Sequence, residues 1–281
     1  MTLLLPRSVD EVCAELAARP DAELLAGGTD LMVGVNAGRH RVATVIALDG
    51  VEGLRGWRRD GDHLVLGAAV TYAELCRADL AELAPVLAQA ARTVGSPQIR
   101  NVGTLGGNLA TASPAGDTLP GLAALDAVVL VRSLGGHREI PFAEFCVGPK
   151  RSALGPGELI VGVRVPVARG PQEFLKVGTR NAMVIAVAAV AVVADRTDRT
   201  IRVGLGSVGP TPLRAPEAEA WAADHVDWGR LALDDPASAD QFGRLVAAAA
   251  RPIDDHRATA QYRRHCVGVL ARRALLRMTA P

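Results

Sequence analysis

Two glycine pairs constrain the fold of this chain more than any other feature of its sequence. Gly27 and Gly28 follow a short apolar run, and Gly106 and Gly107 follow Thr104 in a second loop. Glycine lets the backbone approach a ligand closely, and such a loop exposes N–H groups that can hold a phosphate. A single Gly-Gly turn is more often only structural. Two such loops about 80 residues apart in one small domain favour a shared diphosphate site.

The composition excludes several classes of partner. At about 150 residues per domain, 281 residues make one large domain or two modest ones. Lys and Arg number 31 against 30 Asp and Glu, so no net field draws the chain to a polyanion. Nine aromatic residues are too few for the stacking platforms of a single-strand binder. We therefore expect no nucleic-acid partner.

Membrane and metal binding are also unexpected. The longest uncharged apolar run, residues 182–194, is shorter than the roughly 18 residues that a span needs. The apolar start of the chain is too short for a secretory signal, which predicts a cytoplasmic protein. Cys13, Cys76, Cys146 and Cys266 form no Cys-x-x-Cys pair, so no iron–sulfur cluster or zinc site is predicted.

The first part of the chain predicts a β-α-β-β-α order. Ser8 with Glu11 and Thr71 with Glu74 have the spacing of capping boxes that begin helices. A Gly- and Pro-rich loop region is expected from about residue 94 to residue 116. The remaining elements are expected as strands at 23–26, 44–48, 63–70, 128–131, 159–165 and 174–178, and as helices at 85–93 and 117–124.

A second unit is expected after the Ala-Arg-Gly-Pro stretch that follows Pro166. Residues 182–194 and 201–207 predict an antiparallel hairpin, and three helices are expected at 215–223, 238–250 and 257–278. In the last helix one apolar stripe is expected. Its members are Tyr262, Cys266, Val269 and Leu270. The predicted division is therefore a domain of residues 1–170 followed by one of residues 171–281.

An ordered set of motifs along nearly the whole chain resembles one family. The segments read AGGTD at residues 26–30, VGSPQIRNVGTLGGN at 94–108, SPAGD at 113–117, GPGELI at 155–160, KVGTR at 176–180, PIDD at 252–255 and YRR at 262–264. They resemble the FAD-binding medium subunit of molybdenum hydroxylases. That family includes carbon monoxide dehydrogenase, bacterial xanthine and aldehyde dehydrogenases, and the nicotine and quinoline oxidoreductases.

The resemblance implies an α+β fold. It implies a two-part FAD-binding domain of the p-cresol methylhydroxylase type, followed by a small α+β C-terminal domain with a three-stranded antiparallel sheet and helices. It also implies an electron-transfer subunit that takes electrons from an iron–sulfur subunit and passes them to NAD, a quinone or dioxygen. Molybdopterin and the iron–sulfur clusters would then lie only in the partners, a large molybdenum-binding subunit and a small two-cluster subunit, assembled as a dimer of heterotrimers.

The resemblance also assigns cofactor-binding residues, and no catalytic or metal-binding ones. They are Leu25, Ala26, Gly27, Gly28, Thr29, Asp30, Thr104, Leu105, Gly106, Gly107, Asn108, Asp117, Ile160 and Lys176. Asp117 would bind near the ribityl or diphosphate part, although an N-cap role fits it equally. Ile160 would make an aliphatic contact, although a core strand position suits its residue type better. Lys176 would lie near the flavin, where its replacement by Met should lower the reduction potential; the alternative is an ordinary surface lysine.

Two further expectations concern the flavin and the substrate. Neither His nor Cys stands beside the first loop, so the FAD is expected to be held non-covalently. In the subunits of carbon monoxide dehydrogenases that this chain resembles, His-Ser is expected where this chain has Thr29 and Asp30. This difference argues against carbon monoxide as the substrate. Two other functions stay open: a stand-alone flavin oxidoreductase of the same superfamily, and a non-catalytic assembly module.

Overall fold

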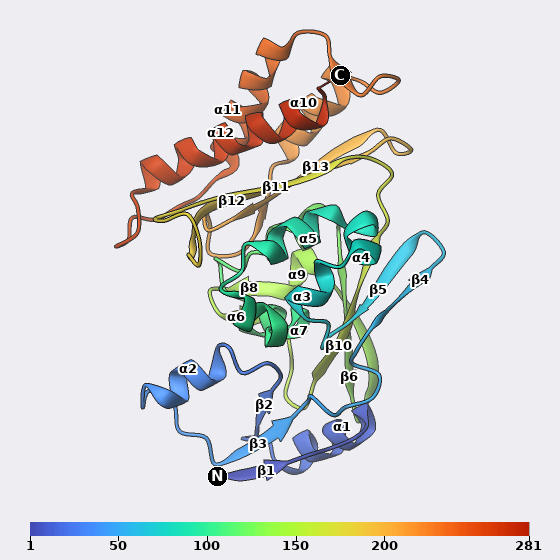
Figure 1. Cartoon of the computed structure of the whole chain (residues 1–281), viewed down its shortest axis with the longest axis vertical. Helices are drawn as coiled ribbons and strands as arrows, with labels where there is room; N and C mark the ends of the chain where they lie inside the picture. The colour runs from blue at the N-terminus through green and yellow to red at the C-terminus, as the bar shows by residue number, and fades with distance from the viewer. Residues whose placement is uncertain (281) are drawn as a thin grey trace.

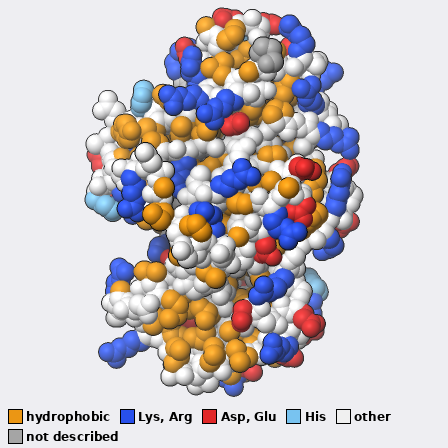
Figure 2. Space-filling model, in the orientation of Figure 1, with side chains coloured by type: hydrophobic (Ala, Val, Ile, Leu, Met, Phe, Trp, Pro, Cys, Tyr) orange, Lys and Arg blue, Asp and Glu red, His pale blue; other side chains and the backbone are white. Residues whose placement is uncertain are grey.

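The computed structural model describes residues 1–280. Its first lobe is a parallel three-stranded sheet in the order β1-β3-β2, with two helices beside it (Figure 1). Its elements are β1 (Thr2–Leu4), α1 (Val9–Ala18), β2 (Glu23–Leu25), α2 (Leu31–Asn36) and β3 (Thr44–Ala47). This lobe stands at the lower end of the molecule, and a constriction sets it off from the remainder in the space-filling view (Figure 2).

The second lobe is built on an antiparallel sheet in the order β4-β5-β10-β6-β7. Its strands are β4 (Trp57–Asp60), β5 (His63–Gly67), β6 (Val128–Ser133), β7 (Gly136–Pro141) and β10 (Leu159–Pro166). Its helices are α3 (Tyr72–Leu75), α4 (Ala78–Leu83), α5 (Pro85–Arg92), α6 (Pro97–Val102), α7 (Leu105–Thr111), α8 (Leu119–Ala124) and α9 (Phe142–Phe145). Short strands β8 (Cys146–Gly148) and β9 (Arg151–Ser152) form a separate hairpin.

The C-terminal part is a four-stranded antiparallel sheet covered by helices. Its main elements are β11 (Gln172–Gly178), β12 (Ala186–Asp195), β13 (Thr200–Gly206), β14 (Leu213–Arg214), α10 (Pro216–His225), α11 (Ala239–Ala249) and α12 (Ala260–Met278). The sheet lies between these helices and the second lobe, whose α5 is seen beneath it in Figure 1. Helix α8 of the second lobe contacts β12 and β13. A small hairpin and one 3-10 turn complete it: β15 (Val226–Asp227), β16 (Ala232–Leu233) and η1 (Pro236–Ser238).

Strand β12 explains the longest apolar run of the sequence. Alternate residues of a strand point to opposite faces. Ala189 and Ala191 belong to the core shared with the second lobe, whereas Val190 and Val192 belong to the core under the C-terminal helices. Because both faces are covered, the strand has no polar alternation, and all of its residues are buried.

Several predictions about elements need correction. The expected loop region forms α6 and α7, which begin at the side-chain caps Ser96 and Thr104. The C-terminal sheet has β14 besides the three expected strands, and β12 begins four residues later than expected, at Ala186. The strands β1, β4 and β7 were not predicted; β4 is exposed throughout and therefore shows no burial alternation.

Helix ends and faces were predicted with mixed success. The box at Thr71 and Glu74 has both of its reciprocal hydrogen bonds and is confirmed. At the first helix Ser8 caps the N–H of Glu11, but the Glu11 carboxylate accepts from the N–H of Arg7 instead of that of Ser8. On α12 the predicted stripe was wrong in two members, since Tyr262 is exposed and Val269 is only half-buried. The buried stripe is Arg263, Cys266, Val267, Leu270, Ala271, Ala274, Leu275 and Met278.

Residues 1–280 contain neither a helix that could span a membrane nor a cluster of possible metal ligands. None of the helices is both long and apolar enough to cross a membrane. No group of three His, Cys, Asp or Glu side chains comes together as metal ligands.

Candidate cofactor site

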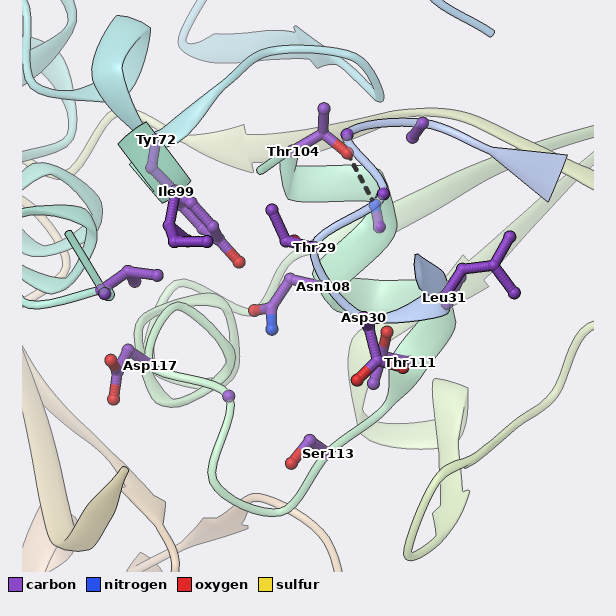
Figure 3. A pocket seen from close by; sticks show the side chains of 18 of the residues that line it. Thr29, Asp30, Leu31, Tyr72, Ile99, Thr104, Asn108, Thr111, Ser113 and Asp117 are labelled. Atoms are coloured by element: carbon purple, nitrogen blue, oxygen red, sulfur yellow. Dashed lines mark hydrogen bonds between the residues drawn. The ribbon is translucent and has the colours of Figure 1, made fainter. Parts of the chain in front are cut away.

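A cavity of about 560 Å³ opens where the two lobes and the C-terminal part meet. The first lobe contributes residues 23–31, the second lobe contributes side chains of α3, α6 and α7, and the loop before β12 contributes residues 183–185. In the close view Thr29, Tyr72, Asn108 and Asp117 surround the open space from four different segments (Figure 3). The size suits a cofactor, because ligand pockets commonly enclose about 300–1,000 Å³.

The first glycine loop touches the second lobe directly. A Cβ atom on Gly27 would lie 1.7 Å from the carbonyl oxygen of Val102, so only glycine permits this approach. Gly28 has a φ of +69°, a conformation that other residues rarely adopt. Within residues 1–280 no hydrogen bond uses the N–H groups of Gly27, Gly28, Thr29 and Asp30. Four consecutive donors at the start of α2 therefore remain for a ligand.

The second glycine loop differs from the expectation that its N–H groups are free. The N–H of Leu105 donates to the carbonyl of Val70 at 2.9 Å, and that of Gly106 donates to the carbonyl of Ala68 at 2.8 Å. The N–H of Gly107 donates to Oγ1 of Thr104 at 3.0 Å, which caps α7. This loop thus offers a ligand side-chain groups and a close approach, but few backbone donors.

Asn108 supplies such a side-chain donor. Its Oδ1 accepts a hydrogen bond from Oγ1 of Thr118 at 2.6 Å, which fixes the orientation of the amide. The amide nitrogen then points toward the open space (Figure 3). A Cβ atom on Gly116 would lie 2.8 Å from that nitrogen, so the glycine leaves room for it.

Tyr72 is a wall residue that sequence reasoning missed. Its ring packs against Gly103, where a Cβ atom would lie 2.8 Å from Cε2 of the tyrosine, and its hydroxyl points into the cavity (Figure 3). Burial, with the nearby charge of Asp117 second, raises the pKa of Tyr72, so the phenol stays protonated and can donate. The only local signal was its place after the capping residue Thr71, which concerns the helix and not a ligand.

Asp117 forms a buried ion pair in the wall of the cavity. Its Oδ2 accepts from Nζ of Lys176 at 2.6 Å and from Oγ1 of Thr93 at 3.3 Å. Its Oδ1 is buried and has no hydrogen-bond partner among the described residues. The carboxylate does not cap α8, since Thr118 occupies the N-cap position. Burial raises the pKa of Asp117, and the neighbouring Lys176 opposes that rise.

A smaller, mostly apolar cavity of about 90 Å³ adjoins the first. Ala26, Thr104 and Gly107 line both cavities, so the two glycine loops stand between them. Ile160 lies in its wall and is almost fully buried, which allows a core role and a ligand contact together.

The structure thus gathers most of the predicted residues, but not all. Ten line the larger cavity: Leu25, Ala26, Gly27, Gly28, Thr29, Asp30, Thr104, Gly107, Asn108 and Asp117. Gly106 and Ile160 line the smaller one. Leu105, which is fully buried, and Lys176 line neither. The described residues that line the two cavities include no His and no Cys.

Fold and site together define a class: a two-lobed cofactor-binding domain whose glycine loops converge, joined to a smaller α+β domain. Residues 1–168 match the family model described as the FAD binding domain in molybdopterin dehydrogenase. Residues 173–278 match the model of the CO dehydrogenase flavoprotein C-terminal domain. The chain therefore belongs to the family of FAD-binding flavoprotein subunits of molybdopterin dehydrogenases, and the family resemblance and fold class predicted from the sequence are confirmed.

Individual relatives agree over nearly the full length. The nicotine 6-hydroxylase medium subunit of Paenarthrobacter nicotinovorans is 32% identical to this chain, and the alignment covers 96% of this chain and 94% of that subunit. The carbon monoxide dehydrogenase medium chain of Afipia carboxidovorans is 32% identical, with 98% and 95% covered. The structure of reconstituted CO dehydrogenase from Oligotropha carboxidovorans superposes with a TM-score of 0.89 at 29% identity, covering 100% of this chain and 98% of that one. The chain is accordingly a flavoprotein oxidoreductase component.

Proposed function

We propose that this chain holds one FAD between its two glycine loops and serves as the electron-transfer subunit of a molybdenum hydroxylase complex. The observation that carries the proposal is the run of four unbonded N–H groups from Gly27 to Asp30 at the edge of the larger cavity. Backbone donors at the start of a helix suit a phosphate anion, because they supply hydrogen bonds and a favourable dipole together. We assign the pyrophosphate of FAD to these four N–H groups.

Asp117 narrows the orientation of the cofactor. An ionised carboxylate has no proton to donate, so its unpartnered Oδ1 needs a hydrogen-bond donor. A pyrophosphate has no donor to offer, and its negative charge would repel the carboxylate. A hydroxyl group of the ribityl chain supplies the donor. Of the two contacts that the sequence left open for Asp117, the ribityl contact is therefore favoured.

The two cavities suit the two ring systems of FAD. The larger one continues from Asp117 to the apolar side chains of Ile99, Met183 and Ile185, which can cover an isoalloxazine without aromatic stacking. The smaller one has an apolar wall that includes Ile160, and it adjoins the glycine loops on another side. We assign the flavin to the larger cavity and direct the adenine toward the smaller. Attachment is non-covalent in this proposal, since neither lining provides a His or Cys.

The chemistry divides between cofactor and chain. Bound FAD supplies the capacity to take up electrons singly and release them in pairs. Gly27 to Asp30 hold the anion, Asn108 and Tyr72 offer donors, and Asp117 offers an acceptor. None of these groups is placed as a catalytic acid or base, which fits a subunit that moves electrons without transforming a substrate.

The partners follow from the family. Relatives such as the nicotine 6-hydroxylase subunit are named as medium subunits, so they act within complexes of several chains. We propose a large molybdenum-binding subunit with molybdopterin and a small subunit with two iron–sulfur clusters, assembled as a dimer of heterotrimers. The final acceptor would be NAD, a quinone or dioxygen. We keep the division into domains of residues 1–170 and 171–281.

A ligand series tests the proposal on the full chain. The purified protein, freed of flavin, is titrated with FAD, FMN and riboflavin, and binding is followed by the flavin spectrum. We expect one FAD per chain and much weaker binding of riboflavin, which lacks the phosphates that the N–H groups recognise. A protein that takes up no flavin would support the assembly-module alternative. Equal affinity for FAD and riboflavin would refute the pyrophosphate site.

A further inference from the structure

Lys176 is buried but does not reach the cavity. Its side chain is 6% exposed, and its Nζ donates to Oδ2 of Asp117 at 2.6 Å, to the carbonyl of Thr93 at 3.1 Å and to Oγ1 of Thr93 at 3.4 Å. An ammonium group has three donors, so these partners account for all of them. A direct contact with the flavin would require the lysine to leave this arrangement.

The two oxygens of the Asp117 carboxylate have different surroundings. Oδ2 of Asp117 is committed to Lys176 and Thr93, while Oδ1 is buried without a partner within residues 1–280. An unsatisfied buried acceptor is costly, and most such atoms in folded proteins have a partner. Asp117 also lines the larger cavity, so a donor of a ligand bound there can supply the partner that Oδ1 lacks.

The lysine comes from a different part of the chain than the residues it contacts. Lys176 lies on β11 of the C-terminal domain, whereas Thr93 follows α5 and Asp117 precedes α8 in the FAD-binding domain. Gln89 of α5 ties the two together: its amide donates to the carbonyl of Gln172 at 3.1 Å and accepts from the N–H of Phe174 at 2.7 Å. The position of Lys176 is therefore set by backbone contacts of its own strand.

From this arrangement we propose that Lys176 is a positioning residue for the cofactor. It holds Asp117 ionised and oriented, with Oδ1 directed at a ribityl hydroxyl, and touches no part of FAD itself. The C-terminal domain thereby sets the affinity of a site whose lining comes mostly from the other domain. This inference rests on the proposed FAD site.

Charge explains why a buried carboxylate there needs the lysine. An uncompensated carboxylate would repel a nearby pyrophosphate and would itself be poorly solvated. The titratable groups that face Asp117 are Lys176 from β11 and Tyr72 from α3, while the hydroxyl of Thr93 faces it from the end of α5. Without the lysine, only the hydrogen bond from Thr93 opposes the rise in the pKa of the carboxyl that burial causes, and the proton then occupies the acceptor that the ligand needs.

The test uses the only two lysines of the chain as a matched pair. Lys176→Met in the full-length protein should weaken FAD binding roughly 10- to 100-fold, the range for losing a hydrogen bond to a charged group. Lys150→Met makes the same substitution at an exposed residue outside both cavities and should leave the dissociation constant unchanged. In Lys176→Met the affinity should recover as the pH rises, with a midpoint above that of the wild type. A purely structural defect would lower the affinity equally at every pH.

A second pair of variants covers a failure of Lys176→Met to fold. Asp117→Asn should weaken FAD binding and abolish its pH dependence, and adding Lys176→Met to it should change the affinity less than twofold. Wild-type affinity in Lys176→Met or in Asp117→Asn would overturn the inference. So would a Lys176→Met protein that binds FAD normally but has a lower flavin reduction potential, because the lysine would then act on the ring. If the wild type itself binds no FAD, the proposed function fails instead.

Discussion

Gly27 lies against the carbonyl group of Val102, so close that a methyl group on the glycine would lie 1.7 Å from the carbonyl oxygen. The contact joins a loop of the first lobe to the end of α6 in the second, across 75 residues of chain. It puts the unbonded N–H groups of the first loop beside the capped start of α7. The relative position of the two lobes, and with it the shape of the larger cavity, depends on this backbone contact.

Gly27→Ala should therefore separate the loops. Because the obstructing atom belongs to the backbone, the first loop must shift, and the N–H groups from Gly27 to Asp30 move with it. We expect FAD affinity to fall at least tenfold, measured by flavin fluorescence, together with a lower melting temperature. Gly34→Ala is the matched control, since its Cβ atom would only contact Cβ of His40 at 3.4 Å. Because Gly34 lies in a helix, Gly34→Ala should raise the free energy of unfolding by about 0.5–1 kcal/mol and leave the affinity of the protein for FAD unchanged.

The convergence of the two glycine loops could be predicted from the sequence because it depends on residue type. Two glycine pairs beside polar residues indicate close backbone approach wherever they fold, and the contact of Gly27 with Val102 is of that kind. Capping is local for the same reason, which is why the box at Thr71 was predicted correctly. The buried run of β12 was also visible, although its first residue was not.

Other features of the site depend on tertiary contacts that leave no local pattern. Whether the N–H groups of the second loop are free depends on Val70 and Ala68, whose carbonyls accept from them. The ion pair of Lys176 with Asp117 joins residues 59 positions apart, with no periodicity to connect them. The helices α6 and α7 were hidden because α6 lies between Gly95 and Gly103 and begins with a proline, while α7 contains two glycines, and both residue types are also typical of loops.

Tyr72→Phe tests the phenol donor. The ring packing against Gly103 is retained, while the hydroxyl that points into the cavity is removed. Loss of one neutral hydrogen bond should weaken FAD binding about 2- to 10-fold, with little change in stability. Tyr262→Phe changes the only other tyrosine, an exposed residue on α12, and should bind FAD as the wild type does. Equal effects in both variants would remove Tyr72 from the site.

Glu158 predicts a pH dependence of stability. Its carboxylate accepts from Nε and Nη2 of Arg138 at 2.9 and 2.6 Å and from the N–H of Gly155 at 2.6 Å. The hydrogen bonds with Arg138, above all, lower the pKa of Glu158 in the folded chain. Because the pKa of Glu158 is lower in the folded chain than in the unfolded one, its carboxylate stabilises the folded chain fully at pH values above the ordinary pKa of 4.5. This stabilisation is lost as the pH falls through the pKa of the folded chain.

Glu158→Gln should consequently unfold at lower urea than the wild type at pH 7. The two unfolding midpoints should approach one another as the pH falls below 4.5, because the wild-type carboxylate then becomes protonated and loses its advantage. Equilibrium urea titrations at a series of pH values measure the difference. A gap that stays constant down to low pH would mean that shape, and not the charge of Glu158, is what the turn before β10 requires.

Arg214 joins the C-terminal sheet to the second lobe. It donates to both oxygens of Glu219 at 2.7 Å, to the carbonyl of Ala123 at 3.1 Å, and to Asp126. Its partners lie on α10, at the end of α8 and just beyond α8, so one guanidinium spans the boundary between the two domains. The side chain is only partly exposed, which limits the compensation that water can give when it is removed.

Arg214→Met should destabilise the chain by about 1.5–3 kcal/mol, because Glu219 loses a charged partner in a poorly solvated place. Arg230→Met is the control: Arg230 also pairs with two carboxylates, Asp227 and Asp234, but it is largely exposed, and water replaces such partners at little cost. Urea unfolding of both variants gives the comparison. If Arg230→Met were as destabilised as Arg214→Met, simple loss of surface charge would account for both. A large effect confined to Arg214 would instead show that its half-buried guanidinium, which has partners in both domains, stabilises the chain through these contacts.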